Sequence, residues 1–216
     1  MKLISVNLGQ ERIVPKGAGT EKTGIYKAAV EGPVAVTRLG LAGDTVCDAK
    51  HHGGPDQAVY VYGAPDYAWW SHELGVELAP GIFGENLTVD GLESARAAIG
   101  DRLTIGTVVL EVTAPRIPCG TLARRMGDPG FVKRYRDAGR PGLYCRVLRE
   151  GSLQAGDAVG YACAPAGAVP VLDLFRDYYV VEPDEATVRR FLASPLAERA
   201  RRDQEKRLEK ILGKKI

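Results

Sequence analysis

Short runs of β-branched and apolar residues, separated by glycine- and proline-bearing breaks, dominate the first 165 residues of the chain. Seven runs have the length and composition of strands: residues 2–8, 32–40, 57–63, 86–92, 102–115, 142–148 and 158–162. Within the longest run, residues 105–107 are expected to form either a tight turn or a bulge. So many strands would leave exposed edges, and a closed or nearly closed antiparallel barrel removes them.

Apolar residues recur at helical spacing in two short segments of this region and in most of the chain after Pro170. Residues 64–75 carry a proline near the first turn and a glycine stop, and residues 131–138 form a second short pattern. In the tail, helices are expected over 171–179, 184–192 and 196–212. We therefore predict a mainly β barrel domain over residues 1–165, with short helices, and a small three-helix domain over 166–216.

Composition and charge narrow the class of protein. Glycine is 26 of 216 residues, about 12% where roughly 7% is usual, which implies many turns. The net charge of +2 argues against broad electrostatic capture of nucleic acid or membranes. The chain lacks an apolar run long enough for a membrane helix and a secretion signal at its start, so a cytoplasmic protein is expected. The four cysteines have neither paired nor dense spacing, which disfavours a disulfide framework or a zinc site.

The chain contains a basic segment, although its net charge as a whole is close to zero. Between Pro115 and Arg140 seven basic residues face two acidic ones, a local charge of +5. An anionic or phosphorylated ligand would find complementary charge there. The alternative is a solvated helix surface.

The densest group of chemically useful residues lies in residues 43–60. It contains His51, His52, Gly53, Gly54, Asp56 and Gln57. Adjacent histidines in a regular strand point to opposite faces, so the two should not both bind one metal. The two glycines permit positive φ and let backbone amides approach an anion, while the acid and the amide supply polar partners. The pattern favours a ligand site over its alternative, a polar turn that precedes a strand.

A second candidate is the segment around Cys119. Two prolines stiffen the segment, Gly120 leaves space beside the thiol, and Arg116 would lower the thiol pKa if its side chain curls back. A thiolate held in this way is a soft metal ligand or a nucleophile. The alternative is a small buried apolar residue.

Two shorter segments add polar candidates. Glu85 and Asn86 come just before a predicted strand, where they would fix a ligand or brace neighbouring loops. Lys27 follows a short apolar pair and would reach inward to an anion, unless it is a surface lysine.

Taken together, these segments resemble the MOSC domain family, the C-terminal domain of molybdenum cofactor sulfurases, and within it the YiiM-like branch linked to resistance to N-hydroxylated purines. The motifs that match are Lys-Thr-Gly-Ile-Tyr-Lys at 22–27, Gly-Asp at 43–44, His-His-Gly-Gly-Pro-Asp-Gln-Ala-Val at 51–59, Phe-Gly-Glu-Asn-Leu-Thr at 83–88, Ile-Gly-Asp at 99–101, Pro-Arg-Ile-Pro-Cys at 115–119, Gly-Leu-Tyr at 142–144 and Gly-Asp at 156–157. Their order and spacing are specific, and they span nearly the whole first domain.

The resemblance implies a MOSC-type β-barrel that binds the molybdenum cofactor (molybdopterin), with Cys119 as the metal ligand, and reduces N-hydroxylated compounds such as 6-hydroxylaminopurine. Pyridoxal phosphate binding is a further family association. His52 and Asp56 would then move protons beside Cys119. The residues expected to hold the cofactor are Lys27, His51, Gly53, Gly54, Gln57, Glu85, Asn86 and Arg116. No cysteine cluster for an iron–sulfur centre follows Cys163, so a separate reductase is expected to supply electrons.

Two other function classes remain open on the sequence. Cys119 could carry a persulfide, as a sulfur or cofactor carrier without reductase activity. Residues 199–215 hold 8 basic and 3 acidic residues and could form a nucleic-acid-binding module, although a tail almost without aromatic residues gives little support for base stacking. We expect the tail helices to have a packing or dimerising role, and no membrane partner.

Overall fold

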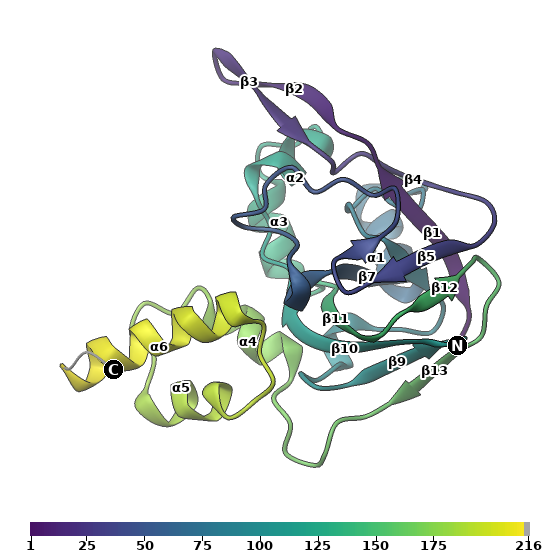
Figure 1. Cartoon of the computed structure of the whole chain (residues 1–216). Helices are drawn as coiled ribbons and strands as arrows, with labels where there is room; N and C mark the ends of the chain where they lie inside the picture. The colour runs from purple at the N-terminus through teal and green to yellow at the C-terminus, as the bar shows by residue number, and fades with distance from the viewer. Residues whose placement is uncertain (214–216) are drawn as a thin grey trace.

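A mixed eight-stranded sheet forms the centre of the computed structural model, which describes residues 1–213 (Figure 1). Its strand order is β13-β9-β10-β11-β7-β8-β1-β4. The strands are β1 (Leu3–Gly9), β4 (Lys27–Ala29), β7 (Val59–Gly63), β8 (Leu87–Val89), β9 (Arg102–Ile105), β10 (Val108–Pro115), β11 (Leu143–Arg149) and β13 (Val159–Ala162). Six of the seven predicted runs thus contribute strands to this sheet, because alternating burial of β-branched residues favours this conformation, and the run of residues 32–40 contributes to a second sheet.

Two smaller sheets complete the β structure. A three-stranded sheet contains β5 (Val34–Thr37), β6 (Gly40–Leu41) and β12 (Gly151–Leu153). The hairpin of β2 (Arg12–Lys16) and β3 (Gly19–Thr23) projects from the main body (Figure 1). The sequence pattern did not predict β2, β3, β4 or β12.

The structure agrees with the expected barrel in fold class, but the main sheet does not close into a barrel. Over residues 1–213 its end strands β13 and β4 do not pair, and a single isolated bridge between Lys2 and Ala158 joins the two sides. The pairing is not entirely antiparallel either, because β7 and β8 run parallel. Between β9 and β10, Val108 pairs with Ile105, so the choice between turn and bulge resolves as a two-residue turn.

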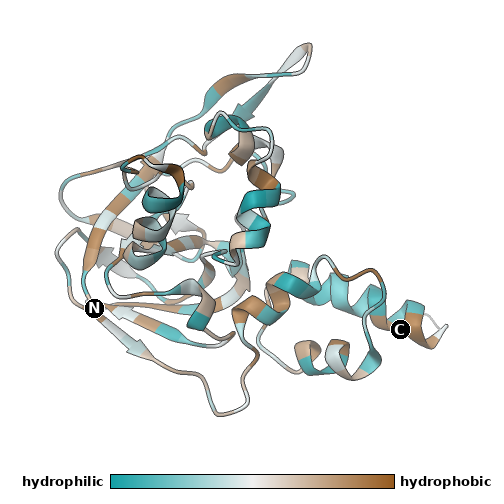
Figure 2. Cartoon of the chain, turned by 180° about the vertical axis from the view of Figure 1, so that it is seen from behind, coloured by the Kyte–Doolittle hydropathy of each residue, from teal (hydrophilic) through white to brown (hydrophobic). Residues whose placement is uncertain are grey.

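Short helices flank the sheet and a helical segment follows it. The elements are α1 (Ala64–Leu74), α2 (Gly120–Arg125), α3 (Phe131–Ala138), α4 (Val171–Asp177), α5 (Glu185–Leu192) and α6 (Glu198–Leu212), with short 3-10 helices η1 (Pro55–Gln57) and η2 (Ser94–Arg96). All five predicted helices are present; α2 was not expected. Figure 2 shows that α6 is hydrophilic over much of its surface. Whether residues 166–216 fold as a separate domain stays a prediction.

The core has an aliphatic part and an aromatic part. The aliphatic part packs between the sheets, and the aromatic part lies among α1, α3 and the ends of β7 and β11. Trp70, Tyr62, Phe83, Phe131 and Tyr135 are its largest fully buried members. Two other members of this aromatic cluster, Tyr60 and Tyr144, line the cavity described below. Among the described residues, no helix is both long and apolar enough to cross a membrane.

Candidate functional site

A cavity of about 460 Å³ opens between the β2–β3 hairpin, the loop of residues 44–57, the start of α2 and the ends of β7 and β11. Eight of the eleven predicted site residues line it: Lys27, His51, His52, Gly53, Gln57, Asn86, Arg116 and Cys119. The fold therefore brings together segments that lie far apart in the sequence.

Cys119 stands at the N-cap of α2 in an extended conformation, with φ −129°. Burial alone would raise the pKa of its thiol. A hydrogen bond with His52, the charge of Arg116 and the backbone N–H of Leu122 outweigh burial and lower the pKa to about 6. At neutral pH the side chain is therefore mainly a thiolate, the form that binds metals and acts as a nucleophile.

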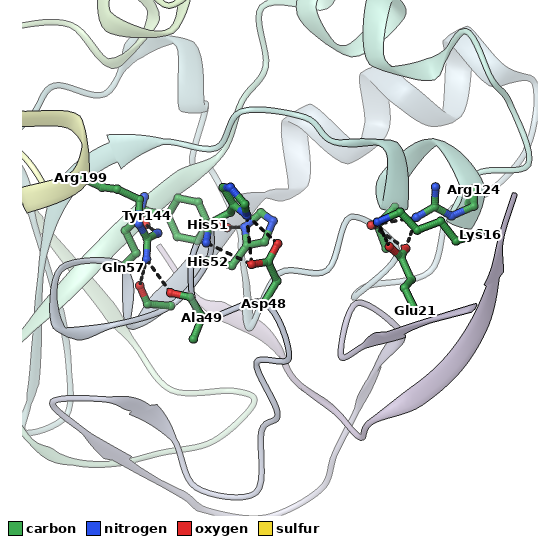
Figure 3. Close-up of polar contacts among 12 residues, drawn as sticks. Lys16, Glu21, Asp48, Ala49, His51, His52, Gln57, Arg124, Tyr144 and Arg199 are labelled. Atoms are coloured by element: carbon green, nitrogen blue, oxygen red, sulfur yellow. Dashed lines mark hydrogen bonds and ion pairs between the residues drawn. The ribbon is translucent and has the colours of Figure 1, made fainter. Parts of the chain in front are cut away.

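His52 links this thiol to a buried tyrosine. Its Nδ1 lies 2.9 Å from the hydroxyl of Tyr144 on β11 (Figure 3). Burial raises the pKa of Tyr144, so the hydroxyl remains protonated and can donate to Nδ1. The imidazole proton is then on Nε2, the nitrogen left to donate to the Cys119 thiolate. Tyr144, His52 and Cys119 thus form one polar chain at the cavity wall.

Arg116 is the buried cation of the cavity. Its Nη1 donates to the carbonyl of Phe83 at 2.7 Å, and its guanidinium carbon lies 4.9 Å from the ring centroid of Tyr60. Its Nε is buried and has no hydrogen-bond partner among residues 1–213. Burial opposes the charge, but the neighbouring tyrosines and Cys119 together raise the pKa of Arg116. A fully charged guanidinium with one unused donor is suited to an anionic ligand.

Gly84 makes room for this arginine. A Cβ at this position would lie 2.8 Å from the Cγ1 of Ile25 and 3.2 Å from the Nη1 of Arg116, and the backbone has φ +76°. Glycine is the residue that tolerates both constraints.

Lys27 reaches into the cavity wall, as predicted, but its charge is paired. Its Nζ contacts both carboxylate oxygens of Asp44, and both side chains are only 7% exposed. Burial lowers the pKa of Lys27, and the Asp44 carboxylate opposes this effect. Asp44 also accepts from the backbone N–H of Gly9 and from the amide of Asn86, each at 2.8 Å. The pair braces the wall and leaves little free charge for a ligand.

Three predicted site residues lie outside the cavity. Glu85 is fully buried beneath it and accepts from Tyr67, Gly81 and Thr88, so it braces its loop, which is one of the two roles expected for it. Asp56 faces the C-terminal helices, and Gly54 is the N-cap of η1. The structure therefore gives no support to Asp56 as a proton donor beside Cys119.

The two histidines diverge, although they lie in a turn and not in the regular strand for which opposite directions are expected. His51 is 63% exposed and pairs with Asp48 at 2.9 Å, whereas His52 turns inward to Tyr144 (Figure 3). In the part of the chain that the structure describes, no three or more His, Cys, Asp or Glu side chains are grouped to hold a metal ion. A metal at this site would have Cys119 as its protein ligand and would need the rest of its ligands from a bound group.

The basic segment of residues 115–140 divides between the cavity and the surface. Arg116 and Arg124 line the cavity. The charges on α3 pair with Asp128 and Asp137 at the surface. Three of the seven basic residues are thus on the solvated helix surface named as the alternative, while Arg125 donates to the carbonyls of Ile82 and Gly81 and Arg140 pairs with the buried Asp66.

Several residues of the cavity were not assigned a role from the sequence. Tyr60, Tyr144 and Asp44 line it. The last two belong to the quoted motifs Gly-Leu-Tyr and Gly-Asp, which are the only sequence signal for them. Cys47 also lines the cavity, but burial raises the pKa of its thiol; Cys145 is in the core.

The lowered pKa of Cys119 predicts its reactivity. In protein without bound cofactor, alkylation of Cys119 by iodoacetamide should reach half its maximal rate near pH 6, because the thiolate is the reactive form and its fraction rises as pH rises through the pKa. His52→Phe removes a hydrogen bond to the thiolate, so its midpoint should move to higher pH. Mass spectrometry of the modified peptide, with Cys119→Ser as the blank, measures both. Identical midpoints in the two proteins would contradict this account of the pKa.

Comparisons with known proteins agree with the geometry. The model of the MOSC domain matches residues 48–160. Protein YiiM of Escherichia coli is 31% identical over 156 residues, which are 70% of this chain and 68% of that protein. A protein of Gibberella moniliformis named Reductase is 34% identical over 180 residues, 81% of this chain but 31% of that protein. The crystal structure of YiiM from Geobacillus stearothermophilus superposes with a TM-score of 0.79 at 28% identity, covering 96% of this chain and 98% of that one.

Proposed function

The chain belongs to the MOSC domain family, and from this premise we propose that it is a molybdenum-cofactor-dependent reductase of N-hydroxylated compounds such as 6-hydroxylaminopurine. The observation that carries the proposal is the Cys119 thiolate, with its pKa lowered to about 6, in a cavity beside a buried arginine. The similarity to a protein named Reductase supports the reaction class.

The residues present fit the cofactor. A thiolate is the soft ligand that molybdenum accepts, and the unused Nε donor of buried Arg116 suits an anionic group. Arg124 also lines the cavity, but its charge is paired with that of Glu21. Cys119 would hold the metal, and Arg116 the anionic part of the cofactor. When bound, the cofactor supplies the two electrons and the centre that accepts oxygen.

The chain itself would supply protons and orientation. Reduction of R–NHOH to R–NH2 consumes two electrons and two protons and releases one water. The proton donated by His52 would be the one on Nε2, which the Cys119 thiolate accepts in the cofactor-free protein, and Tyr144 holds the ring in the tautomer that carries this proton. The aromatic rings of Tyr60 and Tyr144 form part of the wall against which a planar base can lie. The electrons would come from a separate reductase.

Metal content and turnover test the proposal together. Protein made in a cofactor-competent host should contain molybdenum and pterin, and under anaerobic conditions with a reduced artificial donor it should convert 6-hydroxylaminopurine to the 6-amino product. Elemental analysis and chromatography of the products measure these outcomes. Cofactor-loaded protein that forms no product from any N-hydroxylated substrate would refute the proposal.

The Cys119 thiolate also supports a second candidate function, that of a sulfur carrier. A low thiol pKa favours attack on a sulfur donor and formation of a persulfide at Cys119. Cyanide-releasable sulfur on protein that lacks molybdenum would favour this alternative over the reductase.

A further inference from the structure

A residue of the C-terminal helical segment reaches the loop that carries both histidines. The guanidinium of Arg199, in the first turn of α6, donates to the carbonyls of Ala49 at 3.0 Å and Gly53 at 3.4 Å and also to Oε1 of Gln57 (Figure 3). Ala49 and Gly53 stand on either side of the histidine pair. One side chain therefore spans both ends of the turn of residues 49–53.

A second set of contacts joins the same loop to the start of α6. Oδ2 of Asp56 accepts from the backbone N–H of Glu198 at 2.8 Å, and Oδ1 lies 3.1 Å from Nε of Arg146 on β11. Nη2 of Arg146 donates to the carbonyl of Leu196 at 2.9 Å. These contacts fix the start of α6 against the loop and β11, so Arg199 projects from a defined position.

The turn has little other support. Within residues 1–213, the hydrogen bonds that tie residues 48–54 to distant parts of the chain go to Tyr144, Cys119 and Arg199. The remaining bonds are local: the backbone N–H groups of His51 and His52 and the His51 ring bond to Asp48, and the carbonyl of Gly54 accepts from the N–H of Gln57. Gly53 and Gly54 have φ of 71° and 83°, and glycines lose the most conformational freedom when they are ordered. Without an external anchor such a turn has many accessible conformations.

We propose that Arg199 is a positioning residue, which holds the 49–53 turn so that His52 keeps its contacts with Tyr144 and Cys119. The C-terminal helices then complete the site instead of only packing beside it. The part of this inference that concerns turnover rests on the proposed reductase function; the part that concerns order in the loop does not.

The expected consequence lies in the chemical step. His52 would act in proton transfer, and general acid catalysis contributes about 10² to 10⁴ in rate. If His52 is placed imprecisely, part of this rate factor is lost, whereas Arg116 and Cys119 can still bind their ligands. Arg199→Ala should therefore lower kcat about 10- to 100-fold and leave KM within about twofold.

The test uses the full chain and two readouts. Hydrogen–deuterium exchange of residues 48–57 in cofactor-free protein should become about tenfold faster or more in Arg199→Ala, the factor expected from losing a charge-assisted hydrogen bond. Steady-state kinetics of the cofactor-loaded enzyme show whether the substitution changes kcat or KM. Arg199→Lys retains the charge but not the branched set of donors, so it should be intermediate in both.

Arg202→Ala is the matched control. Arg202 lies on the same helix and pairs with Glu198 at 2.6 Å. Among the described residues it forms no hydrogen bond or ion pair with the turn of residues 49–53, so both readouts should match the wild-type protein. Unchanged exchange of residues 48–57 in Arg199→Ala would overturn the inference. Faster exchange with unchanged kcat would also overturn the inference. The turn would then be more mobile in the variant, yet this mobility would not affect proton transfer by His52. If the wild-type enzyme reduces no N-hydroxylated substrate, the proposed function fails, and exchange alone decides whether Arg199 orders the turn.

Discussion

Cys119→Ala will lose at least about 10³-fold in the reduction of N-hydroxylated substrates, a scale set by enzymes that lose an essential side chain. The reason is that Cys119 is the one thiol of the cavity whose pKa is lowered, to about 6. Alanine offers no ligand to a soft metal. Turnover of 6-hydroxylaminopurine per molybdenum bound, measured with an artificial donor, tests this expectation.

Cys47→Ala is the control for that experiment. Cys47 lines the same cavity, but burial raises the pKa of its thiol, so its loss should leave molybdenum content and turnover close to wild type. Wild-type turnover in Cys119→Ala with molybdenum still bound would remove the basis for the proposed function.

Asp44→Ala will destabilise the fold by about 3–5 kcal/mol, the usual cost of removing one partner of a buried ion pair. The substitution leaves Lys27, 7% exposed at its side chain, without its carboxylate. It also removes the acceptor for the N–H of Gly9 and the amide of Asn86. Chemical denaturation, followed by circular dichroism, gives the change in free energy of unfolding.

The double variant Lys27→Met, Asp44→Ala separates the two contributions. Removing the buried cation as well should recover a large part of the loss, because an apolar side chain has no charge to desolvate. If the double variant is as unstable as Asp44→Ala alone, the buried charge is not the cause. A change below about 1 kcal/mol in Asp44→Ala would place the pair among surface ion pairs, contrary to its burial.

The strands and helices that form the core could be predicted because their burial repeats along the sequence. The run of residues 57–63 became β7, and the pattern of 64–75 became α1, which ends at Gly75 with φ 66°. The β2–β3 hairpin was missed since most of its residues are polar and exposed. The parallel pairing of β7 with β8 joins segments that no local pattern relates.

The site could be predicted as a set of segments, but not as a set of side-chain directions. Adjacent residues of an extended chain point to opposite sides, so Asn86 lines the cavity while Glu85 turns into the core. Asp56 turns away at η1 and binds α6, a partner far along the chain. Tyr144 has the sequence signature of a core strand residue, and only its contact with His52 distinguishes it.

The choice between nucleic-acid binding and a packing role for the C-terminal helices also depends on contacts that the sequence does not show. Arg201 donates to the carbonyl of Ser194, and Arg207 contacts Asp177. These arginines, with Arg199, are used inside the molecule, which weakens the case for a nucleic-acid-binding tail. Lys214 and Lys215 of that predicted patch lie outside the described residues.

The bridge between Lys2 and Ala158 has a consequence for synthesis of the protein. The N–H of Leu3 donates to the carbonyl of Asp157, and the N–H of Val159 to that of Met1, so the start of the first strand is bridged to the start of the last strand of the sheet. Contacts between such distant parts of a chain form late and slowly. The N–H and C=O of Leu3 that bond to residues 156 and 157 must therefore stay without these partners until this segment has been translated, and this interval is when a nascent chain is most exposed to aggregation.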